Sequence, residues 1–174
     1  MNNLIAITVG DIQGIGVHLL IDGWKKRKLN NFILLTNFKI FESNKLLSNS
    51  KINVLDNEKK INKFNKKKFN ILNFKTKNRH TNSVDSLKLA QNLTKKELFI
   101  GILTLPLNKL EINKFSSKNF IDQTTFFSNI ESKKNTNMIF IYKNNFFVPL
   151  TTHIELKNVY KHFKKNKLII EKIK

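Results

Sequence analysis

One histidine stands where an α/β protein could present it for chemistry. The apolar run Phe146–Leu150 is followed by Thr151, Thr152 and His153. A buried strand of this kind carries the residues after it to the rim of a sheet, where ligands bind. An imidazole at that rim can bind a metal ion, transfer a proton, or serve as a hydrogen-bonded structural group. For an isolated histidine, the residues alone favour the structural role.

Two other segments place polar side chains after apolar runs. Leu98–Leu107 is the longest apolar run, and Asn108 and Lys109 follow it. The second segment is Asp122-Gln123-Thr124-Thr125. We expect both segments to lie toward His153. Lys109 could attract a phosphate or could simply begin a helix over 110–115, and the residues favour neither interpretation.

A glycine-rich turn near the N-terminus forms a third candidate site. Leu4–Val9 predicts a buried strand, and Val17–Lys28 predicts a helix with Gly10–Gly16 between them. Backbone N–H groups of such a turn can bind an anion, with Asp11, Gly14 and Gly16 in the loop. The spacing is neither the dinucleotide fingerprint nor a P-loop. Glycines needed only for a tight turn explain the pattern equally well.

The remaining pattern alternates strands with helices, which predicts an α/β fold with three layers and a largely parallel sheet. We expect one domain over 1–174, with a lysine-rich variable region at 48–78 and a β-hairpin near 138–150. Further strands are predicted at Phe32–Thr36, Ile52–Leu55 and Phe69–Phe74, and further helices at Lys39–Leu47, Val84–Leu93, Thr124–Ile130 and Glu155–Lys164.

Local signals refine two of these segments. Residues 57–68 are rich in lysine and asparagine and predict a mobile, solvated loop, the alternative being a basic patch in which Phe64 and Phe69 stack on bases. Asn82 or Ser83 is expected to cap the helix over 84–93. His80 would then lie in the loop beside that cap, without a role.

Composition limits the possible partners. The chain has 174 residues, 40% of them hydrophobic, no cysteine and a formal net charge of +20. Only Arg27 and Arg79 are arginines, so the charge comes from lysine, and we expect nucleic-acid binding to be nonspecific only. The apolar runs are too short for a signal peptide or a membrane span. We therefore expect a cytoplasmic protein with no membrane partner.

Four segments, in order, resemble the N-terminal half of the 4-hydroxythreonine-4-phosphate dehydrogenase family of pyridoxine biosynthesis. Ile7–Gly16 is similar to the family's I-T-M-G-D-P-A-G-I-G, and Thr104–Lys109 is similar to T-A-P-L-N-K. Asp122–Phe127 lies where the family has G-H-T-E-F-L. Leu150–Val159 is similar to T-T-H-L-P-L-R-D-V.

The resemblance implies an NAD- or NADP-dependent oxidation of 4-phosphooxy-threonine, followed by loss of carbon dioxide. It also implies a divalent metal (Zn, Mg or Co) held by three histidines across a dimer, of which His153 matches the first. Gln123 and Thr124 match the His-Thr pair that contacts the substrate. A metal suits this chemistry because it stabilises negative charge on the substrate oxygen.

The sequence departs from the family's motifs at several positions. Gln123 replaces a histidine, and an amide can hydrogen-bond but cannot take a proton near neutral pH. Ile12, Gln13, His18 and Thr125 also differ from the family's residues. In addition, the chain ends at Lys174, before the part of the family that carries the other two metal histidines.

Three hypotheses follow from these observations. The chain is an enzyme that is completed by a dimer partner or by a second polypeptide supplying the C-terminal half. Alternatively, it is an inactive, truncated relative that retains only anion or phosphate binding through Gly14–Gly16 and Lys109. The third and weakest hypothesis is a basic nucleic-acid-binding protein, which requires lysines gathered on one folded face.

Overall fold

The computed structural model describes residues 3–115, 120, 122–130, 138–149, 151 and 154–165. The chain divides into two compact units, Met1–Phe127 and Ser128–Lys174. We describe each unit by itself, and the expectation of one domain over the whole chain stays a prediction.

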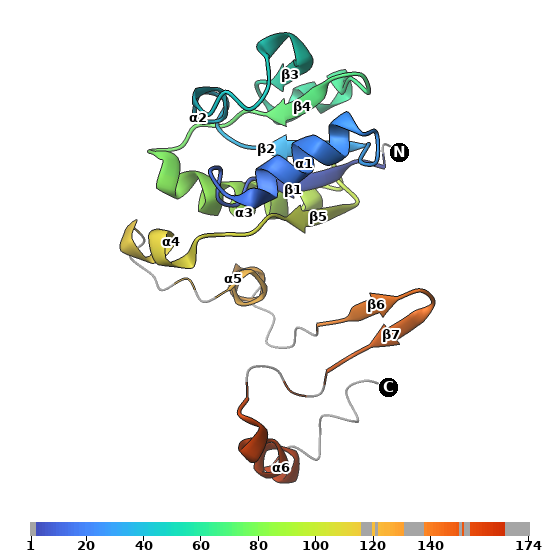
Figure 1. The fold of residues 1–174 in the computed structure, drawn as a ribbon, viewed down its shortest axis with the longest axis vertical. Coiled ribbons are helices and arrows are strands. Elements are labelled where there is room, and N and C mark those ends of the chain that lie inside the picture. The colour runs from blue at the N-terminus through green and yellow to red at the C-terminus, as the bar shows by residue number, and fades with distance from the viewer. Residues whose placement is uncertain are drawn as a thin grey trace. The chain divides into compact units, whose positions relative to one another are not determined.

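The first unit contains a five-stranded parallel sheet with the strand order β3-β4-β2-β1-β5 (Figure 1). The strands are β1 (Ile5–Thr8), β2 (Phe32–Leu35), β3 (Ile52–Leu55), β4 (Phe69–Leu72) and β5 (Gly101–Thr104). Each lies within a predicted strand segment. These runs are apolar because a parallel sheet is covered on both faces. The predicted α/β fold with a largely parallel sheet is therefore confirmed.

Helices connect these strands. The α-helices of the first unit are α1 (Ile15–Lys25), α2 (Phe38–Ser43), α3 (Arg79–Lys95), α4 (Lys109–Phe115) and α5 (Gln123–Ile130), the last of which continues into the second unit. Two short 3₁₀ helices, η1 (Asn49–Lys51) and η2 (Glu58–Lys63), flank β3. α2 is shorter than predicted, and its N-cap is Asn37, whose side chain accepts a hydrogen bond from the Ile40 N–H.

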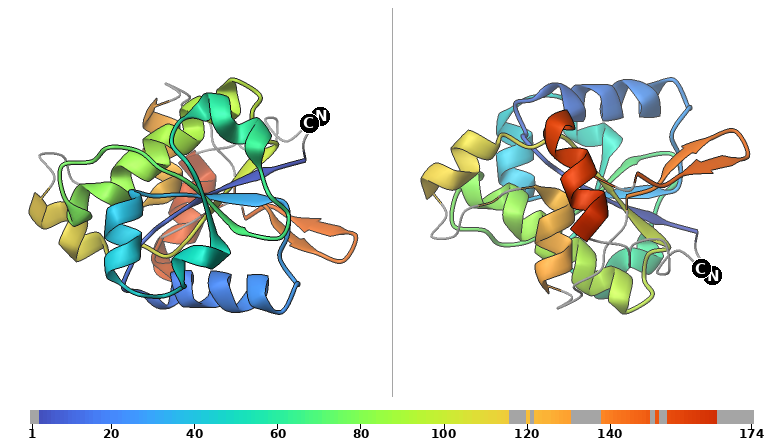
Figure 2. Two further views of the ribbon diagram at one scale, coloured as in Figure 1. Left: turned by 90° about the horizontal axis from the view of Figure 1, so that it is seen from above. Right: turned by 90° about the horizontal axis from the view of Figure 1, so that it is seen from below.

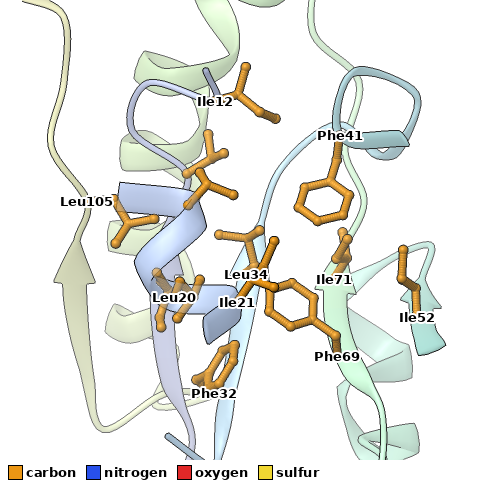
Figure 3. Close-up of a cluster of buried hydrophobic side chains, with 13 residues drawn as sticks. Ile12, Leu20, Ile21, Phe32, Leu34, Phe41, Ile52, Phe69, Ile71 and Leu105 are labelled. Carbon is orange, nitrogen blue, oxygen red and sulfur yellow. The ribbon is translucent and has the colours of Figure 1, made fainter. Parts of the chain in front are cut away.

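Two apolar clusters fill the space on the two faces of the sheet. The first joins the sheet to α1 and α2, and Phe69 lies in it between Phe32 and Phe41 (Figure 3). The second joins the opposite face to α3 through Ala90 and Leu93. α1 and α3 therefore cover opposite faces, as the two views in Figure 2 show, and the predicted three layers are confirmed.

α3 begins earlier than the sequence predicts. Its N-cap is Asn78, whose side chain accepts hydrogen bonds from the backbone N–H groups of His80 and Thr81. The Thr81 side chain bonds the Asn78 backbone in return, which completes a capping box. The prediction that Asn82 or Ser83 is the cap is wrong, because both are buried inside the helix. His80 consequently lies in the first turn of α3 and not in a loop.

The lysine-rich segment 57–68 is more ordered than predicted. Half of it forms η2, whose Ile61 is 6% exposed and packs in the second apolar cluster. Phe64 is partly buried against the same cluster. Phe69 is fully buried in the first cluster, so the alternative in which Phe64 and Phe69 both stack on bases is wrong. Two apolar residues in this basic run, Ile61 and Phe64, therefore hold the segment against the sheet.

The second unit contains the predicted β-hairpin and a helix. β6 (Phe140–Tyr142) pairs antiparallel with β7 (Asn145–Phe147), and α6 (Leu156–Lys165) follows. The turn between them has a positive φ of 53° at Lys143. Within the described ranges, no helix has the length and apolar character needed to cross a membrane.

Candidate functional site

The segments that follow β1 and β5 meet at the carboxyl edge of the sheet. These strands are parallel neighbours, with Thr8 opposite Thr104, so the residues after them emerge side by side. The backbone N–H of Asp11 donates to the carbonyl oxygen of Pro106 at 2.8 Å and ties the two segments together. Ligands bind at this edge in many open α/β sheets.

Two glycines allow this close approach. Gly10 has a φ of +61°, and a Cβ atom placed on it would lie 2.4 Å from the Pro106 carbonyl oxygen. A Cβ atom on Gly16 would lie 2.7 Å from Cδ of Pro106. Gly10 therefore requires glycine for both packing and backbone conformation, and Gly16 requires it for packing alone, whether or not a ligand binds. This favours the tight-turn interpretation of the glycine-rich segment.

Asp11 occupies part of the candidate anion loop itself. Its Oδ1 accepts a hydrogen bond from the Gln13 N–H at 3.0 Å, and its carbonyl oxygen accepts one from the Gly14 N–H at 3.0 Å. A phosphate there would compete for these donors and would meet a carboxylate. Anion binding by Asp11, Gly14 and Gly16 stays a prediction, and the hydrogen bonds weaken the case for it.

Gln123 connects two of the candidate segments. The Thr104 hydroxyl donates to Gln123 Oε1 at 3.1 Å, and Gln123 Nε2 donates to the carbonyl oxygen of Leu105 at 3.0 Å. Gln123 is the first residue of α5, so these bonds hold the start of α5 on the end of β5. The next residue, Thr124, is exposed. The structure thus brings together the segments 104–109 and 122–125.

Asp122 caps α5 beside this connection. Its Oδ1 accepts from the Thr125 N–H at 2.7 Å, and its Oδ2 accepts from the Thr125 hydroxyl at 2.9 Å. The bond from the Thr125 N–H does most to lower the pKa of Asp122; the Thr125 hydroxyl and the positive charge of Lys109 lower it further, against the opposing effect of partial burial. Lys109 is therefore close enough to act on the start of α5 electrostatically.

A polar pocket lies at the same edge, where α3 and α4 begin. It has about 330 Å³ of volume, part of it open solvent, and Asp11, His80, Ser83 and Glu111 line it with five further residues. His80 Nδ1 lies 2.7 Å from Glu111 Oε1, and Arg79 Nη2 lies 3.3 Å from the same oxygen. The prediction that His80 lies in a loop is wrong, and Glu111 is not among the predicted site residues. The Asn78-to-Thr81 capping pattern was the signal that could have placed His80 on the helix.

His153, the predicted metal ligand, lies outside the described residues. Among the residues that the structure does describe, no group of three or more histidine, cysteine or acidic side chains could hold a metal ion. The assignment of His153 as a metal ligand therefore stays a prediction.

Comparison with known proteins identifies the lineage. A protein-family model described as "Pyridoxal phosphate biosynthetic protein PdxA" matches residues 28–174. The chain belongs to the PdxA family. This confirms the family resemblance inferred from the four motifs, although the first motif, Ile7–Gly16, precedes the matched range. No protein with curated annotation matches the sequence.

Solved structures of PdxA relatives share the fold. A 4-hydroxythreonine-4-phosphate dehydrogenase from Klebsiella pneumoniae matches with a TM-score of 0.75 and 16% identity over 91% of this chain and 54% of its own. The enzyme from Burkholderia phymatum matches with a TM-score of 0.74 and 14% identity, over 92% of this chain and 53% of its own. A Salmonella typhimurium protein, provisionally assigned the same activity, matches with a TM-score of 0.77 and 16% identity. The match covers 91% of this chain and 54% of that protein. The chain thus spans about half the length of these relatives.

Proposed function

We propose that this PdxA-family chain contributes to the NAD- or NADP-dependent oxidation and decarboxylation of 4-phosphooxy-threonine, in the cytoplasm. The family match over residues 28–174 supports this reaction class. Because the chain spans about half of its solved relatives, the proposal includes a second copy or a second polypeptide that supplies the remaining groups.

The observation that carries the proposal is the pair of hydrogen bonds made by Gln123. They fix the start of α5 against Thr104 and Leu105, so that Thr124 and Lys109 belong to one local group. Thr124 offers a hydroxyl to the substrate, and Lys109 offers a positive charge to its phosphate. Gln123 keeps a second N–H and a second oxygen lone pair, with which it could also contact the substrate.

The cofactors belong to the proposal alone. His153 is the residue that would contribute to a metal site, with the other ligands coming from the partner. A bound divalent metal would stabilise negative charge on the substrate oxygen while hydride passes to the nicotinamide. Among the described groups, Gln123, Thr124 and Lys109 would bind and orient the phosphorylated substrate.

NADH formation from 4-phosphooxy-threonine tests the proposal. The chain is assayed with Mg²⁺ or Zn²⁺, alone and mixed with a polypeptide that carries the remaining length of a PdxA relative. We expect turnover in the mixture, and we expect Lys109→Ala to raise KM about tenfold or more because a phosphate contact is lost. Lys114→Ala, on the same helix, is the matched control. No turnover in any mixture would contradict the proposal.

One observation favours a second candidate, an inactive relative that still binds phosphate. Gln123 stands where the family resemblance places a histidine, and its amide is engaged by Thr104 and Leu105. Titration calorimetry with 4-phosphooxy-threonine separates the two candidates. Binding that Lys109→Ala weakens and Lys114→Ala leaves intact, without turnover in any mixture, supports the inactive relative. Absence of binding would exclude both candidates.

A further inference from the structure

A second pocket lies at the opposite, amino edge of the sheet. It forms where α1 ends and where β2 and β4 begin, and its volume is about 190 Å³, part of it open solvent. Trp24, Asn31, Phe64, Lys66 and Lys68 are among the residues that line it. None of the four family-like motifs described above contributes to it, and the proposed dehydrogenase chemistry does not use it.

Two aromatic side chains give the pocket apolar walls. The Trp24 ring packs edge-on against Phe69, with centroids 5.4 Å apart and planes at 84°. Because Phe69 is fully buried, this contact fixes the Trp24 ring while leaving part of it accessible. Phe64 is anchored on the second apolar cluster and is likewise half-buried. Fixed, partly exposed aromatic rings are suited to stacking against a planar group.

The charged side chains that line this pocket are all positive. Lys66 and Lys68 line the pocket, and none of its described lining residues carries a carboxylate. Neither lysine forms an ion pair with a described residue, whereas Lys26 pairs with Asp22 at 2.8 Å and Lys60 with Asp56 at 2.5 Å. The segment 25–28, directly after Trp24, adds further positive charge. The pocket therefore combines a stacking surface with cations available to a ligand.

We propose that this pocket binds a nucleotide unit, with the base against Trp24 and Phe64 and the phosphate at Lys66 and Lys68. Stacking on aromatic rings and phosphate contacts with lysine are the two interactions that such a ligand requires. The exposed Asn31 side chain can bond the polar edge of the base. Because much of this volume is open solvent, the pocket is too shallow to enclose a base, so the base lies across its mouth against the two rings and the phosphate lies at the lysines.

A free mononucleotide and a single-stranded nucleic acid both offer a base and a phosphate, and one experiment distinguishes between them. Trp24 is the only tryptophan, so its fluorescence reports binding at this pocket directly. Adenosine monophosphate, ribose 5-phosphate and a short single-stranded oligodeoxyadenylate are titrated at matched salt. We expect quenching by the mononucleotide and by the oligomer, and at least tenfold weaker binding of ribose 5-phosphate. Tighter binding of the oligomer would assign the pocket to a strand, and similar affinities would assign it to a free nucleotide.

Charge-matched variants provide the control. We expect Lys66→Ala/Lys68→Ala to weaken binding at least tenfold, whereas Lys39→Ala/Lys88→Ala removes the same charge from exposed positions on α2 and α3 and changes it less than twofold. Equal losses in both variants, ribose 5-phosphate binding as tight as that of the mononucleotide, or no change in Trp24 fluorescence would each overturn the proposal. Circular dichroism verifies that both variants are folded. The result is independent of the dehydrogenase assay, because that assay concerns the other edge.

Discussion

The carboxyl and amino edges of one sheet differ in how their polar groups are held. At the carboxyl edge, side chains bond backbone atoms that are distant in sequence: Ser86 Oγ accepts from the Val9 N–H at 3.2 Å and donates to the Leu35 carbonyl oxygen at 2.7 Å. Asn82 similarly bonds Thr36 and Asn37. At the amino edge, Asn70 also bonds backbone atoms of Asn65 and Lys68, but the side chains of Lys66 and Lys68 have no such partners among the described residues.

This difference separates two kinds of constraint on the sequence. Residues at the carboxyl edge are determined by the fold, because each satisfies a buried backbone group or makes room for one. The side chains of Lys66 and Lys68 bond no group in the part of the chain that the structure describes, so a ligand or solvent can account for them. Substitutions at the carboxyl edge should consequently lower the stability of the fold, whereas substitutions of the amino-edge lysines should weaken ligand binding.

The largest effect is expected at Gly10. Gly10→Ala should lower the free energy of unfolding by about 2–4 kcal/mol, because the new Cβ meets the Pro106 and Leu105 carbonyl oxygens in a positive-φ conformation. Urea unfolding followed by Trp24 fluorescence measures it. Gly101→Ala is the control, since a Cβ there has nothing within 4 Å, and it should stay within about 0.5 kcal/mol of wild type. Equal losses at both positions would contradict the tight-packing account.

Ser86→Ala should follow in size. It leaves the Val9 N–H and the Leu35 carbonyl without their side-chain partner in a fully buried site, at a cost of about 1–3 kcal/mol. The same urea titration measures the loss. Ser43→Ala removes an exposed hydroxyl that bonds only the Ile40 carbonyl, and it should cost about 0.5 kcal/mol or less. A Ser86→Ala chain as stable as the Ser43→Ala chain would show that the carboxyl edge tolerates an unpaired donor.

Asp122 should produce a smaller, pH-dependent effect. Its pKa is lowered below the ordinary 3.8 in the folded state, so the ionised carboxylate stabilises the fold above that pH. This contribution should be lost as the pH falls through the lower, folded-state pKa. Asp122→Asn keeps an oxygen for the Thr125 N–H but loses the charge, and at neutral pH it should cost about 0.5–1 kcal/mol.

The pH dependence of the difference between wild type and Asp122→Asn is the decisive measurement. That difference, taken from urea titrations, should shrink toward zero below pH 3.8. Glu97→Gln controls for removing one negative charge from a chain of net charge +20. If Asp122→Asn and Glu97→Gln gave the same difference at every pH, the local hydrogen bonds and Lys109 would have no special effect on Asp122.

Most of the fold could be predicted from the sequence because its strands are continuous apolar runs. Leu4–Val9 and Phe32–Thr36 contain β1 and β2 with errors of one residue at an end. The start of α3 could not be predicted in the same way, since polar residues such as Asn82 and Ser86 read as surface or cap residues. They are buried because their partners lie at or just after the ends of β1 and β2, and sequence alone does not reveal contacts between such distant segments.

The candidate site was predictable as a set of segments but not as a set of contacts. The motifs placed Lys109, Gln123 and Thr124 in one family pattern, and the structure adds the bonds from Gln123 to Thr104 and Leu105. The pairing of His80 with Glu111 required the helix start to be known. At the amino edge, composition suggested a solvated lysine loop, because one buried residue, Ile61, carries little weight among so many charges.

The smallest stability effect is expected at the amino edge. Lys66→Ala/Lys68→Ala should change the free energy of unfolding by no more than about 0.5 kcal/mol, with the sign toward stabilisation at low salt, because repulsion among positive charges is relieved. Glu111→Gln at the carboxyl edge should instead destabilise by about 0.5–1 kcal/mol, since Glu111 faces both His80 and Arg79.

Urea titrations at low and high salt separate these two charge changes. Salt should abolish the stabilisation of the double lysine variant, because the repulsion is screened over about 10 Å at 0.1 M salt. High salt should reduce the loss of stability in Glu111→Gln only partly. In the wild type, His80 Nδ1 lies 2.7 Å from the Glu111 carboxylate, and salt screens an interaction at so short a distance less. A clear destabilisation of the double lysine variant at both salt concentrations would mean that Lys66 and Lys68 hold the fold together. The contrast between the two edges would then disappear.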